Sequence, residues 1–228
     1  MVVPNYIPNP IEIPNNVTEQ PYLVRLAYTR RVLSLHLLSV IVTAALAWYV
    51  PSPLRPGAAL IGVLAYLVVL SLVRIALRGR RSEVLVSSFL LAPFLALLAL
   101  TARSAESAGV PVWAVLPGIG CAYLYALLCG RDFSFVGQMV LAWIASAVII
   151  AIISIANGHE GPYALAAQAV NAAYLAYYVY DSASLLSRRR LDEASAAVVD
   201  LYRDVFNLFG YVPRVVQHWQ KHRIWHLR

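Results

Sequence analysis

The sequence predicts an all-α polytopic membrane bundle of six transmembrane helices plus a seventh buried or re-entrant helix. Three observations support this prediction: the composition, the length of the uncharged segments and the placement of the charges. Of the 228 residues, 61% are hydrophobic and only 13% are charged, and the mean hydropathy is +0.68. Soluble domains are typically about 45–50% apolar and about 25% charged. The composition therefore excludes a disordered chain, a coiled coil and an ordinary soluble enzyme.

Six uncharged segments follow one another along the chain. Each is long enough to cross about 30 Å of hydrocarbon as a helix that rises about 1.5 Å per residue. Helix is expected because a backbone in lipid must satisfy its own hydrogen bonds, and the alternating segments typical of a transmembrane β-barrel are missing. The predicted spans are 32–50, 57–73, 84–102, 107–130, 133–158 and 161–180.

A seventh apolar segment, 194–212, differs from the other six because it contains acidic residues, among them Asp200 and Asp204. We expect Asp192 to cap its first turn. Basic residues flank this segment on both sides, and both groups favour the same side of the membrane. The helix is therefore predicted to enter and return, or to lie buried within the bundle.

The basic residues also predict the orientation, since cytoplasmic loops are enriched in Lys and Arg. They lie before the first span, after the second, fourth and sixth spans, and in the C-terminal tail. The opposite loops hold only Arg55 and Arg103. We therefore expect both termini on the cytoplasmic side, and we expect a bacterial cytoplasmic membrane because no organelle signal is visible.

Three parts of the chain are distinguished by composition. An extended Pro/Asn-rich arm is predicted over 1–27, a seven-helix membrane domain over 28–212, and a basic, Trp/His-rich tail over 213–228. The histidines of the tail recur every four residues, a spacing that can bind zinc or copper on a helix, but an interfacial helix anchored by tryptophan is the favoured interpretation. We predict no metal site. The net charge of +7 does not indicate nucleic-acid binding, because the cations lie between apolar segments.

Some polar residues inside the spans have structural interpretations. We expect His36 to be hydrogen-bonded within the bundle, in preference to acting as a proton relay. Gln168 and Asn171 are expected to make hydrogen bonds between helices. No arrangement of residues indicates catalysis, so the chain is not expected to be an enzyme.

Three motifs stand near the ends of the last spans. Residues 131–137 read RDFSFVG, residues 178–182 read YVYDS, and residues 201–209 read LYRDVFNLF. In this order they resemble the transmembrane Bax inhibitor motif family, which includes bacterial calcium-leak members; the third motif is similar to that family's LYLDIINLF. A weaker match is RRVLS at 30–34. The resemblance covers roughly residues 28–209.

The resemblance implies a functional pair of carboxylates. Asp181 and Asp204 are expected to meet near the cytoplasmic side, where an arginine at the end of the second helix pairs with Asp181 and latches a pore. Arg78 is the best positional match for this arginine, and Arg74 is the second choice. Two carboxylates in a poorly solvated site cannot both ionise without cost, so they would share a proton. Carboxylates also suit calcium, the one possible cofactor. The implied function is a pH-sensitive calcium leak gated by the aspartate pair.

A local interpretation of the same residues stays open. Arg203 can neutralise Asp200 and Asp204 as a cluster within one helix, three residues and one residue away in sequence. Asp181 can likewise cap a helix end beside the basic run Arg188–Arg190.

The alternative function is a non-conducting accessory or scaffold subunit of a larger membrane complex. The arm and the tail favour it, because such extensions often lie along a partner's surface. The second and third spans also lack the acid that family members commonly carry, and Arg203 stands at a position that is usually apolar. The predicted partners are thus the lipid bilayer and, through the arm and tail, other membrane subunits, but no nucleic acid.

Overall fold

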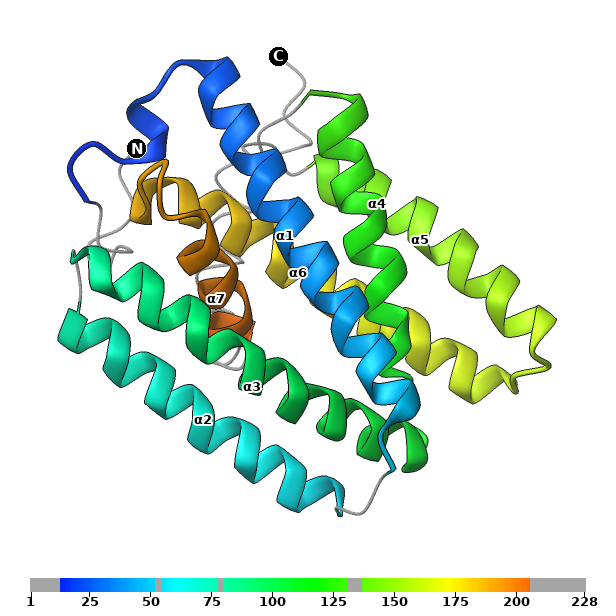
Figure 1. Ribbon diagram of the computed structural model, residues 1–228. Coiled ribbons are helices and arrows are strands. Elements are labelled where there is room, and N and C mark those ends of the chain that lie inside the picture. Colours follow the sequence, from blue (N-terminus) through cyan, green and yellow to red (C-terminus); the bar gives the residue numbers. More distant parts are fainter. Residues whose placement is uncertain (1–12, 52–54, 78–79, 131–136, 206–228) are drawn as a thin grey trace, which may run out of the picture.

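The computed structural model describes residues 13–51, 55–77, 80–130 and 137–205. These residues form seven α-helices and two short 3-10 helices, and no strand occurs among them (Figure 1). The all-α prediction is confirmed for this part of the chain. The helices are α1 (Tyr22–Tyr49), α2 (Pro56–Leu77), α3 (Arg81–Ser107), α4 (Val115–Leu128), α5 (Gly137–Ala156), α6 (Gly161–Arg188) and α7 (Ala194–Val205), with η1 (Val17–Glu19) before α1 and η2 (Val112–Ala114) before α4.

Three of the described helices, α1, α2 and α3, are long and apolar enough to cross a membrane. Two shorter apolar helical stretches, Val112–Leu128 and Val140–Ala156, correspond to the predicted fourth and fifth spans. The helix α6 also follows the predicted sixth span but continues well beyond it. The structure therefore has apolar helices where the sequence predicted them, and three of the described helices have the length and composition of a full membrane span.

Several helix boundaries differ from the predicted spans. The first helix begins at Tyr22 and the sixth ends at Arg188, because charged residues outside the apolar stretch still continue a helix when they find partners. The predicted span 107–130 is interrupted. Gly109 adopts a positive φ of 83° and Pro111 follows it, so α3 ends before them at Ser107 and η2 begins after them at Val112.

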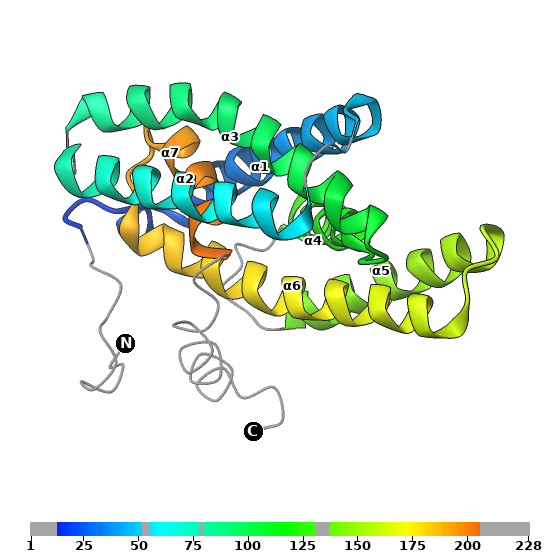
Figure 2. The ribbon, with the colours of Figure 1, turned by 90° about the horizontal axis from the view of Figure 1, so that it is seen from below.

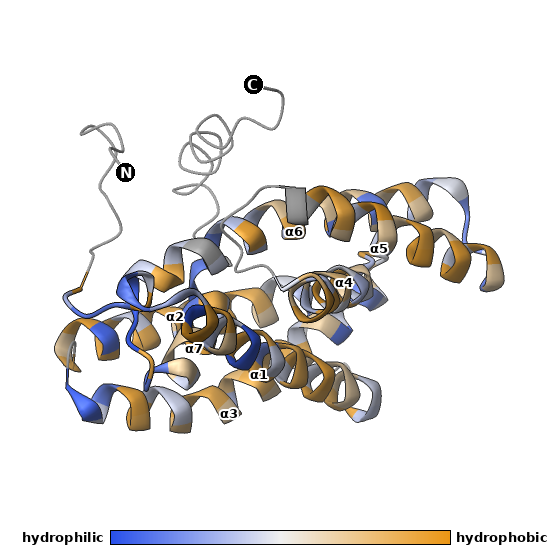
Figure 3. Cartoon of the chain, turned by 90° about the horizontal axis from the view of Figure 1, so that it is seen from above, coloured by the Kyte–Doolittle hydropathy of each residue, from blue (hydrophilic) through white to orange (hydrophobic). Residues whose placement is uncertain are grey.

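Many large apolar side chains face outward, while small and polar side chains are common among the buried residues. On α5 the buried positions recur every four residues, as expected for one face of a helix. They are Ala142, Ser146, Ile150 and Ser154. Leucine, isoleucine and phenylalanine side chains remain exposed on the outer faces of α2, α3, α5 and α6, and hydrophobic residues extend along most of these helices (Figure 3). Such continuous apolar exposure is typical of a surface that faces lipid.

The seventh helix lies inside the bundle. It contacts α1, α3 and α6 and, more weakly, α2, and it lies between α3 and α6 (Figure 2). Most of its described residues, Ala194–Val205, are buried, Asp200 and Leu201 completely. The described part of α7 therefore lies within the bundle. It begins at Ala194, so the prediction that Asp192 caps it is wrong; the residue before the helix is Glu193, whose carboxylate accepts a hydrogen bond from the Arg190 backbone N–H.

The part of the N-terminal arm that is described, residues 13–20, crosses the end of α6. The Ile13 N–H donates to the Ser187 carbonyl over 3.2 Å, and the Val17 N–H donates to the Arg189 carbonyl over 3.1 Å. These carbonyls stand at the end of a helix, where no intrahelical donor reaches them. Val17 is fully buried, so this segment fixes the position of the last turn of α6.

The close packing of α4 on α6 makes a first prediction. A Cβ atom at Gly118 would overlap the Asn171 side-chain oxygen, and the Asn171 amide is held by a 2.8 Å hydrogen bond to Ser146. Gly118→Ala is therefore expected to lower the free energy of unfolding by about 1–3 kcal/mol. Gly120→Ala is the matched control, because a Cβ there meets open space. We expect it to be neutral or stabilising in the same detergent unfolding assay; equal effects of the two substitutions would contradict the close approach.

Candidate functional site

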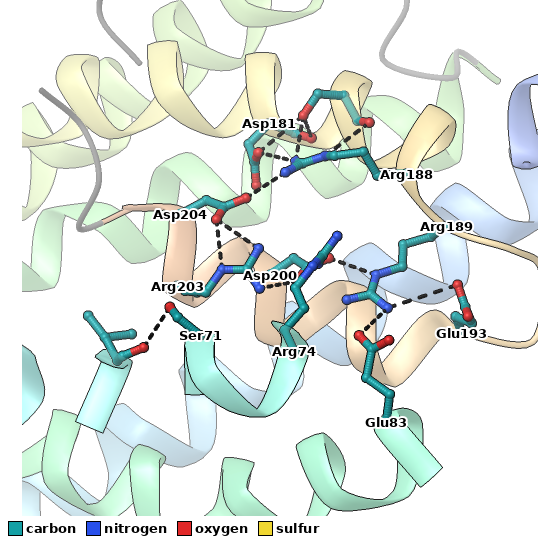
Figure 4. A network of polar contacts seen from close by, with 12 residues as sticks. Ser71, Arg74, Glu83, Asp181, Arg188, Arg189, Glu193, Asp200, Arg203 and Asp204 are labelled. Atoms are coloured by element: carbon teal, nitrogen blue, oxygen red, sulfur yellow. Dashed lines mark hydrogen bonds and ion pairs between the residues drawn. The ribbon is translucent and has the colours of Figure 1, made fainter. Parts of the chain in front are cut away.

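Carboxylates and guanidinium groups alternate in a connected network around α7 (Figure 4). Most of its members are nearly inaccessible to solvent, although charged side chains are seldom buried without partners. The network contains Arg74 of α2, Glu83 of α3, Asp181 and Arg188 of α6, Arg189 and Glu193 of the α6–α7 connection, and Asp200, Arg203 and Asp204 of α7.

The guanidinium of Arg188 bridges the two carboxylates that the sequence singled out. Its Nη2 lies 2.5 Å from Asp181 Oδ1, and its Nη1 lies 2.8 Å from Asp204 Oδ2. Nη2 also donates to the Ser184 hydroxyl over 2.6 Å. Asp181 and Arg188 face the same side because α6 continues as a helix through both, and positions seven residues apart lie two turns apart on one face. We call this unit the Arg188 bridge.

A second guanidinium continues the network along α7 itself. Arg203 Nη1 lies 3.0 Å from Asp200 Oδ1, and Arg203 Nη2 lies 2.9 Å from Asp204 Oδ1. The three charged residues of α7 therefore form the local cluster that the sequence left as an open interpretation. The same carboxylate of Asp204 also contacts Arg188, so the local cluster and the pairing between helices exist together.

Asp200 is surrounded by arginines from three segments. Arg189 Nε lies 2.7 Å from Asp200 Oδ2, and Arg74 and Arg203 contact Oδ1. Arg189 in turn reaches Glu83 of α3 over 2.8 Å. Burial alone would raise the pKa of Asp200, but the guanidiniums, that of Arg189 foremost, outweigh it and hold the pKa well below its usual range. We call this unit the Asp200 clamp.

Comparison with known protein families identifies the fold. Residues 25–219 match the family model described as "Inhibitor of apoptosis-promoting Bax1". The chain belongs to this family. Comparisons with curated proteins and with solved structures gave no match. The family match includes α1 to α7 and the whole charged network, and it confirms the resemblance expected from the motifs. Together with the apolar helices, it makes this member of the Bax1-inhibitor family an integral membrane protein.

The arginine that the structure shows between the two aspartates is Arg188. Arg74, the second choice for the latch, pairs with Asp200 and, within the described part of the chain, not with Asp181. Arg78, the first choice, lies outside the described residues. The sequence prediction placed the end of the helix at residue 180, and Arg188 was therefore treated as a loop residue. The spacing of Asp181 and Arg188, two helical turns, was the signal that could have paired them.

Two further network residues were missed by sequence reasoning. Glu83 is an acid in the first turn of α3, one residue before the predicted span 84–102, and it is almost fully buried. Arg189 was counted only as a topology signal. An acid directly before an apolar run and a basic run directly after one are also common at exposed helix ends, so the sequence alone gave no reason to bring them together.

The remaining sequence predictions have mixed outcomes. His36 is hydrogen-bonded within the bundle as expected, with its Nδ1 3.1 Å from the Tyr178 hydroxyl. Asn171 and Gln168 bond from α6 to α5, as predicted, through Ser146 and the Ala147 carbonyl. The motif at 131–136, the end of the third motif after Val205, and the histidines of the tail lie outside the described residues.

Proposed function

We propose that this protein lets calcium leak across its membrane and that the Arg188 bridge is a pH-sensitive latch. The observation that carries the proposal is that one guanidinium joins carboxylates of two different helices, Asp181 of α6 and Asp204 of α7. Asp181 is 0% exposed and Asp204 is 3% exposed. If either carboxylate is neutralised, water therefore cannot take its place beside the Arg188 guanidinium. The latch is closed while both carboxylates are ionised.

Acidification opens the latch in this proposal. A proton on either carboxylate removes one of the two negative charges that compensate Arg188 and leaves a buried cation poorly paired. The contact between α6 and α7 then weakens, and the charge change becomes a change in helix packing. Carboxylate oxygens released from the guanidinium are hard ligands of the kind that calcium prefers. The basic residues of the sequence support a cytoplasmic location for this end of the bundle.

Calcium flux into proteoliposomes tests the proposal. The wild-type protein is expected to conduct more calcium as the pH falls from about 8 to about 5, through the range in which buried carboxylates take up protons. Asp204→Asn is expected to abolish this pH dependence, because the amide cannot titrate. Glu106→Gln is the matched control. Glu106 lies at the other end of α3, where it accepts hydrogen bonds from the Trp113 N–H and the Tyr163 hydroxyl. Unchanged pH dependence in Asp204→Asn would reject the latch.

The second candidate is a non-conducting accessory or scaffold subunit. The observation that favours it is that guanidiniums already occupy the positions between the carboxylates, with Arg188 and Arg203 both on Asp204. Among the described residues no group of three or more acids, histidines or cysteines is placed to hold a metal ion. Purification in mild detergent distinguishes the two functions. A stable stoichiometric assembly without flux supports the scaffold, and a lone protein with flux supports the leak.

A further inference from the structure

Two successive turns of α7 are held by different carboxylates, Asp200 and Asp204. We infer that Asp200 is a positioning residue that anchors the first half of α7 when the Arg188 bridge opens, so that only the last turn of the helix moves. This inference rests on the proposed latch and states which part of α7 the latch controls. The anchor is built from Asp200 with Arg74, Arg189 and Arg203.

The first argument is the number and origin of the contacts. Both oxygens of Asp200 are engaged, Oδ2 by Arg189 and Oδ1 by Arg74 and Arg203. These arginines come from the α6–α7 connection, from α2 and from α7 itself. Arg189 continues to Glu83 of α3, so the clamp joins α7 to three other parts of the fold. Loss of any one contact therefore weakens the clamp without abolishing it.

The Arg188 bridge is less completely satisfied. Asp181 Oδ2 is buried without a hydrogen-bond partner among the described residues, although its Oδ1 contacts Arg188. An unpartnered buried carboxylate oxygen favours uptake of a proton, whereas a carboxylate with three guanidiniums resists it. As the pH falls, the Arg188 bridge is therefore protonated before the Asp200 clamp. Asp204 follows Asp200 by four residues, about 6 Å along the helix axis, so the two sites act on successive turns.

Other charged and titratable groups near Asp200 do not change this order. Its surroundings include Tyr28 of α1, Arg74 of α2, Glu83 of α3, Asp181 and Arg188 of α6, Arg189, Asp192 and Glu193 of the connection, and Arg203 and Asp204 of α7. The guanidiniums in direct contact with Asp200 keep its pKa well below the usual range despite its burial. Asp200 stays ionised at the acidity that protonates the bridge.

Amide hydrogen exchange of the full-length protein in detergent tests the inference. Two sets of amides are compared, those of residues 197–200 and those of residues 201–205. The first set begins at Ala197, whose N–H makes the first backbone hydrogen bond of α7, to the Glu193 carbonyl. After correction for the intrinsic pH effect, lowering the pH from about 8 to about 5 is expected to speed exchange of the second set about tenfold, a loss of protection from local opening. The first set is expected to change less than about twofold.

Substitution of a clamp residue decides between an anchor and a bystander. Arg74→Gln removes the guanidinium that α2 contributes to the clamp. The variant is expected to fold, because the Arg74 side chain is 21% exposed and Asp200 keeps two guanidiniums. In Arg74→Gln at low pH, residues 197–200 are expected to lose protection together with 201–205. Arg81→Gln, an exposed arginine at the start of α3, is the matched control and should behave as wild type.

Three results would overturn the inference. Two of them concern the wild type: both sets of amides lose protection together at low pH, or neither set responds to pH. The third concerns Arg74→Gln: protection of residues 197–200 stays as high as in the wild type. A failure of the proposed leak is distinguishable, because it appears as an absence of calcium flux and leaves the exchange pattern of α7 unchanged.

Discussion

Arg188→Met is expected to destabilise the protein by about 3–5 kcal/mol at neutral pH, because it removes one partner of a buried ion pair and leaves Asp181 without a cation. Asp181 and Asp204 both lose the guanidinium that joins them, and neither can recover the energy from water, since they are 0% and 3% exposed. Methionine keeps most of the apolar volume, so the loss is electrostatic and not a cavity effect. Unfolding in mild detergent at about pH 8 gives the free energy.

The neighbouring arginine provides the control for this experiment. Arg190→Met removes the same charge two residues further on, where the side chain is exposed. Exposed substitutions of this kind usually change stability by no more than about 0.5 kcal/mol. A similar small effect of Arg188→Met would show that the bridge contributes little to holding α7 in place. The comparison shows whether the loss of stability depends on the buried position of Arg188 or only on the removal of one positive charge.

Tyr202→Ala is expected to cost about 3–5 kcal/mol, because it removes a buried aromatic ring from the apolar face of α7. The Tyr202 ring lies 4.9 Å from the His36 ring of α1 and 5.7 Å from the Phe94 ring of α3, measured between centroids. Its hydroxyl is 2.7 Å from the Ser39 hydroxyl. Tyr202 thus fixes α7 on the side opposite to the charges, and its loss opens a cavity among three helices.

The conservative variant divides this effect into its parts. Tyr202→Phe keeps the ring and removes only the hydrogen bonds of the hydroxyl, to Ser39 and Thr43, so it is expected to cost about 0.5–1.5 kcal/mol. The two variants are compared in one detergent unfolding series. If Tyr202→Phe were as damaging as Tyr202→Ala, the hydrogen bonds and not the ring packing would hold α7 on α1 and α3.

The sequence predicted the helices well because their signal is local. An uncharged run of about 20 residues has few alternatives to a membrane helix, and the Tyr-Arg-Asp motif around Asp204 marked the helix that carries the site. The burial of α7 was one of two predicted alternatives. It followed from basic residues on both flanks, a pattern that disfavours crossing. These predictions needed no knowledge of which helices touch.

The partners of the charges were harder to predict because packing determines them. Hydropathy marks where a chain meets lipid and not where a helix ends, so the continuation of α6 to Arg188 was missed. Glu83 and Arg189 are 106 positions apart in the sequence, and only the fold brings them within 2.8 Å. Arg74 pairs with Asp200 and not with Asp181 for the same reason, because the packing of α2 against α7 determines which carboxylate it reaches. Long side chains at helix ends have several possible partners, and the sequence does not indicate which of these partners each side chain contacts.

One substitution measured in two backgrounds tests the central claim most directly, namely that Arg188 is the counter-ion of Asp181. In the wild type, Asp181→Asn is expected to lower the free energy of unfolding by about 1–3 kcal/mol, because the guanidinium loses an ionised partner. In the Arg188→Met background the same substitution is expected to raise it, because it removes a buried carboxylate that has lost its cation. An effect of the same sign and size in both backgrounds, measured by unfolding at about pH 8, would contradict the account.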